Sequence, residues 1–301
     1  RFTNSGIFAF DFNNRAFRFI RRETPDFFGS RIRVRLFMLK KNKKQIEKLP
    51  NSLYDLDITE SGLWIGVTAY GEGQSLLFGS KAVALPQQLG FPLVRAIDDE
   101  TALVINSRTG WLEKNAWIIT SAGEVNAHFY AGDAVQDLLA SKTFLVVTYF
   151  DESAYISSMI EGNGVAIFDI EGNFLFGYKD LFGDEAVDVA DCYAACWAEE
   201  NHVLFFPYTD FPLVSFDLES KTQKVWKTPS VVVGSDAISS LGDRIYFHSP
   251  YRDESGIYEW QIGNESAQRI NSYSSHLRGL PKGQFLAVGK AGYTIVSMPE
   301  I

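Results

Sequence analysis

A stretch of four short β-type segments in the second half of the chain constrains the fold more than any other feature. Residues 184–227 contain VADCYAACW, an apolar segment HVLFFPY, an alternating segment PLVSFDLE and a polar segment TQKVWK. Turn-forming residues separate these segments at Glu199-Glu200-Asn201, Thr209-Asp210 and Glu219-Ser220-Lys221. Alternation of apolar and polar residues is typical of strands with one buried face. The stretch therefore predicts a unit of four short strands.

The same four-strand pattern recurs along the chain at intervals of about 40 residues. We predict further units at residues 6–50, 53–86, 91–132, 134–180 and 236–273, followed by a shorter one that contains HLRGLP, FLAVGKAG and YTIVSMPE. The second strands of successive units end on Tyr70, Arg108, Tyr149, Tyr208 and Tyr251. A repeated four-strand unit without helical periodicity is typical of a β-propeller. We therefore predict an all-β protein in which residues 1–301 form a single propeller domain.

The number of blades follows from how the two ends of the chain are assigned. Seven units predict seven four-stranded blades, and because the last unit lacks an outer strand, we expect residues 2–5 to supply it and close the ring. If residues 7–21 are shared between two blades, the number falls to six. In the same region Arg31, Arg33 and Arg35 alternate along one predicted strand, and the lysine-rich residues 40–44 are predicted to form a hairpin tip. This basic region is either a solvated surface or a patch that binds a partner.

The period and strand order are similar to those of WD40, kelch and NHL propellers across essentially the whole chain. The signature Gly-His and Trp-Asp pairs and the kelch Gly-Gly are missing, so the similarity is one of period. The segments DCYAACW (191–197) and FPYTDFPLV (206–214) also resemble a family of bacterial propeller-like proteins. This resemblance implies the fold and brings no activity with it.

Composition excludes some classes of function. A net charge of −9 argues against nucleic-acid binding, which requires a basic surface. No apolar run approaches the roughly 20 residues of a membrane span. Cys192 and Cys196 are predicted to point to the same face of one strand, about 13 Å apart and too distant for a disulfide. Two reduced thiols favour the cytoplasm, although a leader removed ahead of the initial Arg-Phe-Thr would change that expectation. We also expect the protein to be a monomer.

Tyrosine and aspartate recur where second strands end and where first strands begin. In a propeller these positions lie on one face, so we expect an acidic and aromatic rim around one mouth of the central channel. Tyrosine offers a ring face and a hydroxyl, and aspartate accepts hydrogen bonds, which suits polyols, amines or a basic peptide. Such residues also cap turns through bonds to the backbone. The candidate rim consists of Arg108, Trp111, Asp133, Asp137, Tyr149, Asp151, Asp188, Asp191, Tyr208, Asp210, Asp236, Tyr251 and Asp253.

Two functional hypotheses follow. The first is a non-enzymatic recognition module that uses this rim to bind a protein partner, for example as a scaffold or to neutralise a toxin, or to bind a small polar ligand. The alternative is a metal-dependent hydrolase or lyase with Asp137, Asp188, Asp191 or Asp236 as ligands. Clustered carboxylates could hold Ca²⁺, but no glycine-rich ligand loop at fixed spacing supports a cofactor. The four histidines lie in separate units, so we expect no catalytic residues among them.

Overall fold

The computed structural model describes residues 10–11, 16–17, 40–45, 53–70, 73–110, 112–155, 160–289 and 292–299. The chain divides into two compact units, Arg1–Val34 and Arg35–Ile301. In the first unit, β1 (Phe10–Asp11) pairs with β2 (Ala16–Phe17) in an antiparallel hairpin. The second unit contains six four-stranded sheets.

Each sheet is one blade of antiparallel strands. The first blade consists of β4 (Leu53–Ile58), β5 (Trp64–Tyr70), β6 (Gly73–Phe78) and β7 (Lys81–Ala84). The second consists of β8 (Pro92–Ala96), β9 (Thr101–Asn106), β10 (Ala116–Thr120) and β11 (Val125–Phe129). The third consists of β12 (Val135–Ala140), β13 (Phe144–Tyr149), β14 (Val165–Asp169) and β15 (Phe174–Gly177).

The remaining blades follow the same plan. The fourth consists of β16 (Asp191–Glu199), β17 (His202–Tyr208), β18 (Leu213–Asp217) and β19 (Thr222–Trp226). The fifth consists of β20 (Ala237–Leu241), β21 (Arg244–His248), β22 (Gly256–Gln261) and β23 (Gln268–Ser272). The sixth consists of β24 (Arg278–Leu280), β25 (Gln284–Gly289), β26 (Gly292–Ser297) and β3 (Lys40–Gln45).

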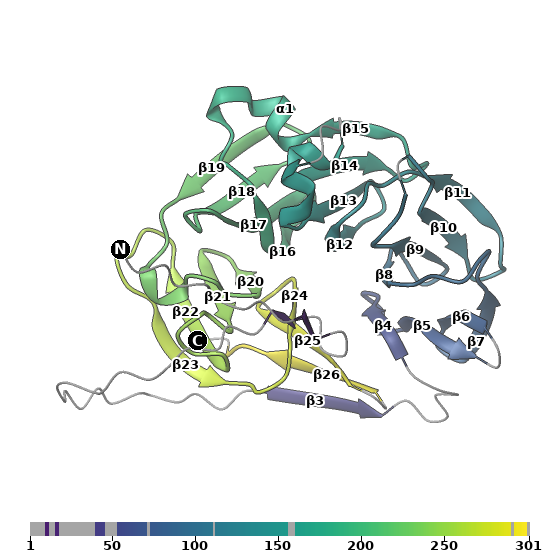
Figure 1. The fold of residues 1–301 in the computed structure, drawn as a ribbon. Coiled ribbons are helices and arrows are strands. Elements are labelled where there is room, and N and C mark those ends of the chain that lie inside the picture. Colours follow the sequence, from purple (N-terminus) through teal and green to yellow (C-terminus); the bar gives the residue numbers. More distant parts are fainter. Residues whose placement is uncertain are drawn as a thin grey trace. The chain divides into compact units, whose positions relative to one another are not determined.

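The second unit is a β-propeller with six blades. Figure 1 shows the sheets around a common centre, with the first strand of each blade facing it. Short helices lie in the connections: α1 (Tyr178–Phe182), η1 (Asp151–Tyr155), η2 (Glu161–Asn163), η3 (Gly183–Glu185) and η4 (Ser230–Val232). None of the described helices is long and apolar enough to span a membrane.

The prediction of seven blades is wrong, and six is the number observed. From the unit predicted at residues 6–50, the described residues Lys40–Gln45 supply the outer strand of the last blade by pairing with β26. The lysine-rich segment is therefore a strand and not a hairpin tip. Lysine is common on strands at a sheet edge, where charge discourages pairing with another chain. Residues 2–5, predicted to fill this place, and residues 31–39 lie outside the described residues.

Apolar clusters fill the interfaces between neighbouring blades. Tyr178, Phe205 and Phe216 lie in the cluster between the third and fourth blades, with ring centroids of Tyr178 and Phe205 5.0 Å apart. Phe206 and Phe247 pack between the fourth and fifth blades. At the joint between the sixth and first blades the buried cluster is small: Leu56, Leu286 and Tyr293. The core is thus divided into wedges, and among the described residues the smallest wedge lies where the ring closes.

The two cysteines are free and buried, as predicted, but they point in opposite directions. Cys192 packs between the third and fourth blades and Cys196 between the fourth and fifth. A bulge between Cys192 and Ala194 leaves Tyr193 unpaired and shifts the alternation of side chains by one residue. The expectation of a shared face was therefore wrong. Burial raises the pKa of both thiols.

Candidate functional site

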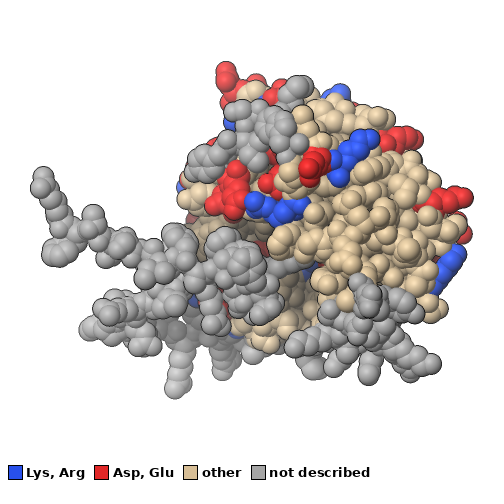
Figure 2. All heavy atoms as spheres, turned by 45° about the vertical axis from the view of Figure 1, so that its right-hand side comes forward, with Lys and Arg blue, Asp and Glu red and all other residues tan. Residues whose placement is uncertain are grey.

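One face of the propeller, here called the upper face, carries the loops into each first strand and the loops between second and third strands. Antiparallel pairing within every blade brings these two kinds of loop together. Several exposed large apolar side chains lie on this face: Tyr54, Phe91, Leu112, Tyr208 and Tyr251. In the view of Figure 2 much of the surface is uncharged, and acidic and basic side chains adjoin one another near its middle.

Four aromatic residues of the fourth and fifth blades form a cluster on the upper face, which we call the tyrosine patch: Tyr193, Tyr208, Phe211 and Tyr251. The ring centroid of Tyr193 lies 5.0 Å from that of Phe211 and 5.9 Å from that of Tyr251. Tyr208 stacks on Tyr193 with 6.3 Å between centroids. Phe211 is only 3% exposed, whereas Tyr208 is 43% and Tyr251 57% exposed. A buried phenylalanine thus supports tyrosine rings that face solvent.

The backbone around the patch holds these rings in place. The β16 bulge aims Tyr193 at its aromatic neighbours, and its hydroxyl shares a hydrogen bond with that of Tyr251. Phe211 has a φ of 54°, an unusual conformation for a bulky residue. Its carbonyl oxygen accepts a hydrogen bond from Thr228 Oγ1 at 2.6 Å. Gly234 lies against the Tyr251 ring so closely that a Cβ there would meet Tyr251 Cγ at 2.3 Å. The patch is a preorganised surface.

Asp191 lies beside the patch at the start of β16, directly opposite Tyr208 in the strand register. Its Oδ1 is buried and accepts no hydrogen bond from the described residues. Burial, and then the nearby negative charge of Asp151, raise the pKa of Asp191 to about 7. An aspartate in these surroundings is ionised in only part of the population near neutral pH.

Carboxylates on the first strands of other blades have cationic partners. Arg95 Nη1 lies 2.8 Å from Asp55 Oδ2, and its Nη2 donates to Asp137 Oδ1. Arg278 contacts Asp55 at 3.1 Å and Asp57 at 2.7 Å. We call these five residues the channel network. Burial alone would lower the pKa of Arg95, but the charges of Asp137, Asp55 and Asp57 raise it overall.

Most of the remaining predicted rim residues are also engaged by neighbours. Arg108 lies 3.4 Å from Asp133 and 2.6 Å from Glu152. Asp253 Oδ2 lies 2.6 Å from Arg269 Nε, and this hydrogen bond lowers the pKa of Asp253. Asp188 accepts a bond from Thr209 Oγ1 at 3.3 Å, and Asp210 lies in an exposed turn.

Asp236 joins two histidines from different parts of the chain. His248 Nδ1 lies 3.3 Å and His276 Nδ1 3.5 Å from its carboxylate oxygens. Burial opposes ionisation of Asp236, but its bonds to the two histidines lower its pKa overall. The sequence does not indicate that these three residues lie close together, because the histidines belong to separate units.

The structure separates the predicted rim into residues on the surface and residues inside. Tyr149 is fully buried, and its hydroxyl donates to Ala131 O at 2.6 Å, so it lies in the core. Trp111 lies outside the described residues. Tyr208, Tyr251 and Asp191 do come together. Sequence reasoning missed Tyr193 and Phe211. Phe211 directly follows the Thr209-Asp210 turn, which was the available signal for this residue.

The described residues contain no group of three or more His, Cys, Asp or Glu side chains arranged to hold a metal ion. Of the four proposed ligands, Asp137 is bound by Arg95, Asp236 by histidines and Asp188 by Thr209. Asp191 therefore stands apart from the other three.

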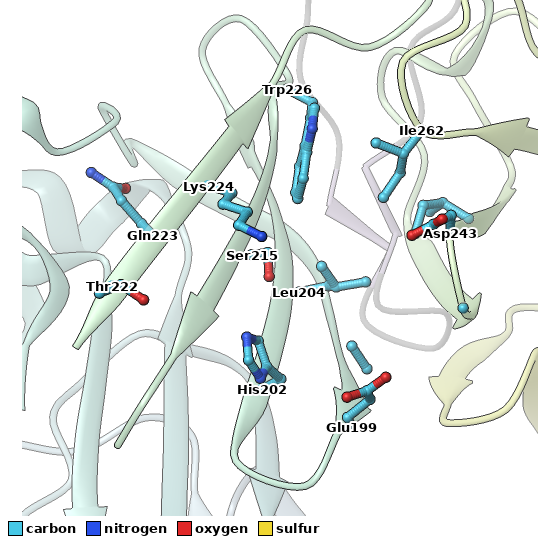
Figure 3. A pocket seen from close by; sticks show the side chains of 13 residues that line it. Glu199, His202, Leu204, Ser215, Thr222, Gln223, Lys224, Trp226, Asp243 and Ile262 are labelled. Carbon is cyan, nitrogen blue, oxygen red and sulfur yellow. The ribbon is translucent and has the colours of Figure 1, made fainter. Parts of the chain in front are cut away.

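A separate groove of about 260 Å³ opens between the fourth and fifth blades on the face opposite the tyrosine patch. Figure 3 shows Trp226 and Lys224 on one wall and Asp243 and Ile262 on the other. His202 and Glu199 line its lower end in this view. Its lining mixes apolar groups with both signs of charge.

Comparison with solved structures agrees with the class that the fold defines, a β-propeller. The chain is similar to virginiamycin B lyase from Staphylococcus aureus, with a TM-score of 0.54 and 12% identity over 87% of this chain and 100% of the lyase. It is also similar to the β-propeller domain of Myceliophteria thermophila Cps50 (Swd1), with a TM-score of 0.51 and 12% identity over 82% of this chain and 84% of that one.

A third similar structure is the PQQ-bound aldose sugar dehydrogenase from Streptomyces coelicolor, with a TM-score of 0.50 and 9% identity over 86% of this chain and 97% of the dehydrogenase. At such identities the likeness shows the fold alone. No protein-family model matches the chain, and a search of curated protein sequences gives no significant match.

Proposed function

We propose that this β-propeller is a non-enzymatic recognition module that binds a protein partner through the tyrosine patch. The observation that carries the proposal is a set of exposed tyrosine rings held rigidly over a buried phenylalanine. Exposed aromatic residues on a preorganised frame lose little conformational entropy on binding, and tyrosine is enriched among residues that dominate binding energy.

The interior of the patch supports the same function. Phe211 contacts all three tyrosine rings, with centroid distances of 5.0, 5.6 and 5.7 Å to Tyr193, Tyr208 and Tyr251. A positive φ at a bulky residue costs free energy, and such strain is concentrated at functional sites. This strained residue lies in contact with every tyrosine of the patch.

The metal-dependent hydrolase or lyase is less well supported. Three of its four candidate ligands already have other hydrogen-bonding or ion-pair partners among the described residues. Propellers serve as scaffolds, binding proteins and enzymes alike, so the fold does not decide between them.

The test compares two single variants that differ in where they lie. The full-length chain and its Tyr208→Ala and Tyr54→Ala variants are immobilised and exposed to an extract of the source organism. Tyr54 is the matched control, because it lies on the same face and is 41% exposed, against 43% for Tyr208. We expect a partner that is retained by the wild type and by Tyr54→Ala and is lost from Tyr208→Ala. Equal retention by both variants would contradict the proposal.

A further inference from the structure

The charges around Asp191 differ from those around the other first-strand carboxylates. The groups that interact with it come from its own strand, from η1, from the end of β17 and from the loop after β21: Cys192, Tyr193, Asp151, Tyr208 and Tyr251. Among the described residues none of these neighbours is cationic. Asp55, Asp57 and Asp137, by contrast, each have an arginine within ion-pair distance. Asp191 has a negative neighbour where the others have a positive one.

The tyrosine patch supplies the other elements of a cation site. The negative face of an aromatic ring attracts an ammonium or guanidinium group, and tyrosine hydroxyls can accept its hydrogen bonds. Tyr208 and Tyr251 present exposed rings, and Asp191 lies opposite Tyr208 in the strand register, partly exposed as a residue although its Oδ1 is buried. A carboxylate beside exposed tyrosine rings is complementary to a basic side chain.

We propose that the tyrosine patch recognises an arginine or lysine side chain on the surface of its protein partner, with the Asp191 carboxylate as the counter-charge. The inference rests on the proposed function and adds the chemical class of the group that is bound. A bound cation offsets both the burial of Asp191 and the repulsion from Asp151. Binding therefore requires ionised Asp191, and the fraction of Asp191 that is neutral in the free protein releases its proton to solvent on binding.

The pH dependence follows from this linkage. With a pKa of about 7 in the free protein, Asp191 is mostly ionised at pH 8 and mostly neutral at pH 6. Because the cation binds the ionised form, affinity should fall about tenfold between pH 8 and pH 6. Arginine and lysine carry their positive charge at both values, so the change belongs to the protein.

The experiment measures binding of pentaarginine, pentalysine and pentaglutamine peptides to the full-length chain by isothermal titration calorimetry at pH 6 and pH 8. We expect the basic peptides to bind at pH 8 and pentaglutamine to bind at least tenfold more weakly. Asp191→Asn should weaken basic-peptide binding at pH 8 about tenfold or more and abolish its pH dependence. Asp243→Asn on the opposite face removes the same unit charge and should change binding less than twofold.

The inference is overturned if Asp191→Asn and Asp243→Asn behave alike, or if the basic peptides bind no better than pentaglutamine. Tyr251→Leu provides a second variant that keeps every charge and removes one exposed ring; it should also weaken basic-peptide binding. If Tyr208→Ala loses the natural partner while Asp191→Asn retains it at pH 8, the proposed function holds and the cation inference fails. If neither variant loses it, both fail.

Discussion

The channel network and the tyrosine patch are built on the same local feature, a bulge in the first strand of a blade. Bulges occur at Tyr54 in β4, at Gln136 in β12 and at Tyr193 in β16. In β4 and β12 an aspartate directly follows the bulge and accepts the next backbone N–H, at 2.9 Å for Leu56 and 2.7 Å for Leu138. In β16 that position is Ala194, and the aspartate lies three positions earlier, at Asp191.

This displacement separates two uses of a carboxylate. After the bulge the side chain lies among the first strands, where arginines reach it. Before the bulge it lies at the upper face beside exposed aromatic rings, where the described chain supplies no cation. The first arrangement satisfies its charges internally, and the second leaves one for a partner. An aspartate placed after the bulge thus has a structural role, whereas one placed before the bulge is left available for binding.

The largest expected effect is a loss of stability on removing Arg95, the arginine at the centre of the channel network. Arg95→Met leaves Asp137 without its arginine, and Asp55 with Arg278 alone, in surroundings where the Arg95 side chain is 6% exposed. An uncompensated buried charge costs about 3–5 kcal/mol, which urea unfolding measures as a loss of free energy of unfolding. Arg108→Met is the control, since its side chain is 38% exposed and its loss should cost below about 1 kcal/mol. Equal losses would remove the distinction between the two kinds of ion pair.

A smaller effect of opposite sign is expected at Asp191. Its pKa is raised in the folded state, so the folded chain holds a proton that the unfolded chain has released, and stability falls as pH rises from about 4 to 7. Asp191→Asn avoids this loss. Its stabilising effect should grow over that range to on the order of 2–4 kcal/mol and then stay constant.

Melting temperatures recorded from pH 4 to pH 8 test this prediction at Asp191. Asp243→Asn, in an exposed turn, should follow the wild type at every pH. If the melting temperature of Asp191→Asn also changes with pH as that of the wild type does, ionising Asp191 costs no stability. The energetic contrast with the channel network would then be wrong.

The smallest expected effect concerns the hydrogen bond between Thr228 and Phe211 in the tyrosine patch. Thr228→Val removes the hydrogen bond to Phe211 O and keeps the shape of the side chain. Loss of one buried hydrogen bond should cost about 1 kcal/mol. Because the bond holds Phe211 under the tyrosine rings, near-ultraviolet circular dichroism should change as well. As a control, Thr143→Val at an exposed position should change neither the spectrum nor the stability. If the Thr228→Val spectrum is identical to that of the wild type, the positions of the tyrosine rings do not depend on this hydrogen bond.

The sequence predicted the blades of residues 53–273 because each consists of short strands with period-two alternation and clear turns. It did not predict how the ring closes. The strand Lys40–Gln45 has no apolar alternation, so nothing local marks it as a strand; its pairing with residues 292–297 decides its structure. The apparent unit in residues 6–50 therefore gave one blade too many.

The site was predicted in part for the same reason. Equivalent positions led to Tyr208 and Tyr251, but Tyr149 at a similar strand end is buried. The bulge at Tyr193 changes which side chains share a face, and sequence period cannot show a bulge. Apart from Asp137, the members of the channel network were not predicted, because they are isolated charges in short apolar strands, such as Arg95 in Pro92–Ala96, and come together only around the ring.

The closing strand also bears on the order in which the molecule can be made. During synthesis β3 emerges before every blade, yet its partner β26 is the last strand of the propeller to leave the ribosome. Bringing together segments about 250 residues apart adds only a logarithmic entropy cost, but contacts of such long range slow folding. We expect blades to assemble one after another while β3 waits for its partner strand. Until translation has passed Ser297, β3 is without β26 and the nascent propeller is an open arc, which makes this the stage most exposed to aggregation and most dependent on chaperones.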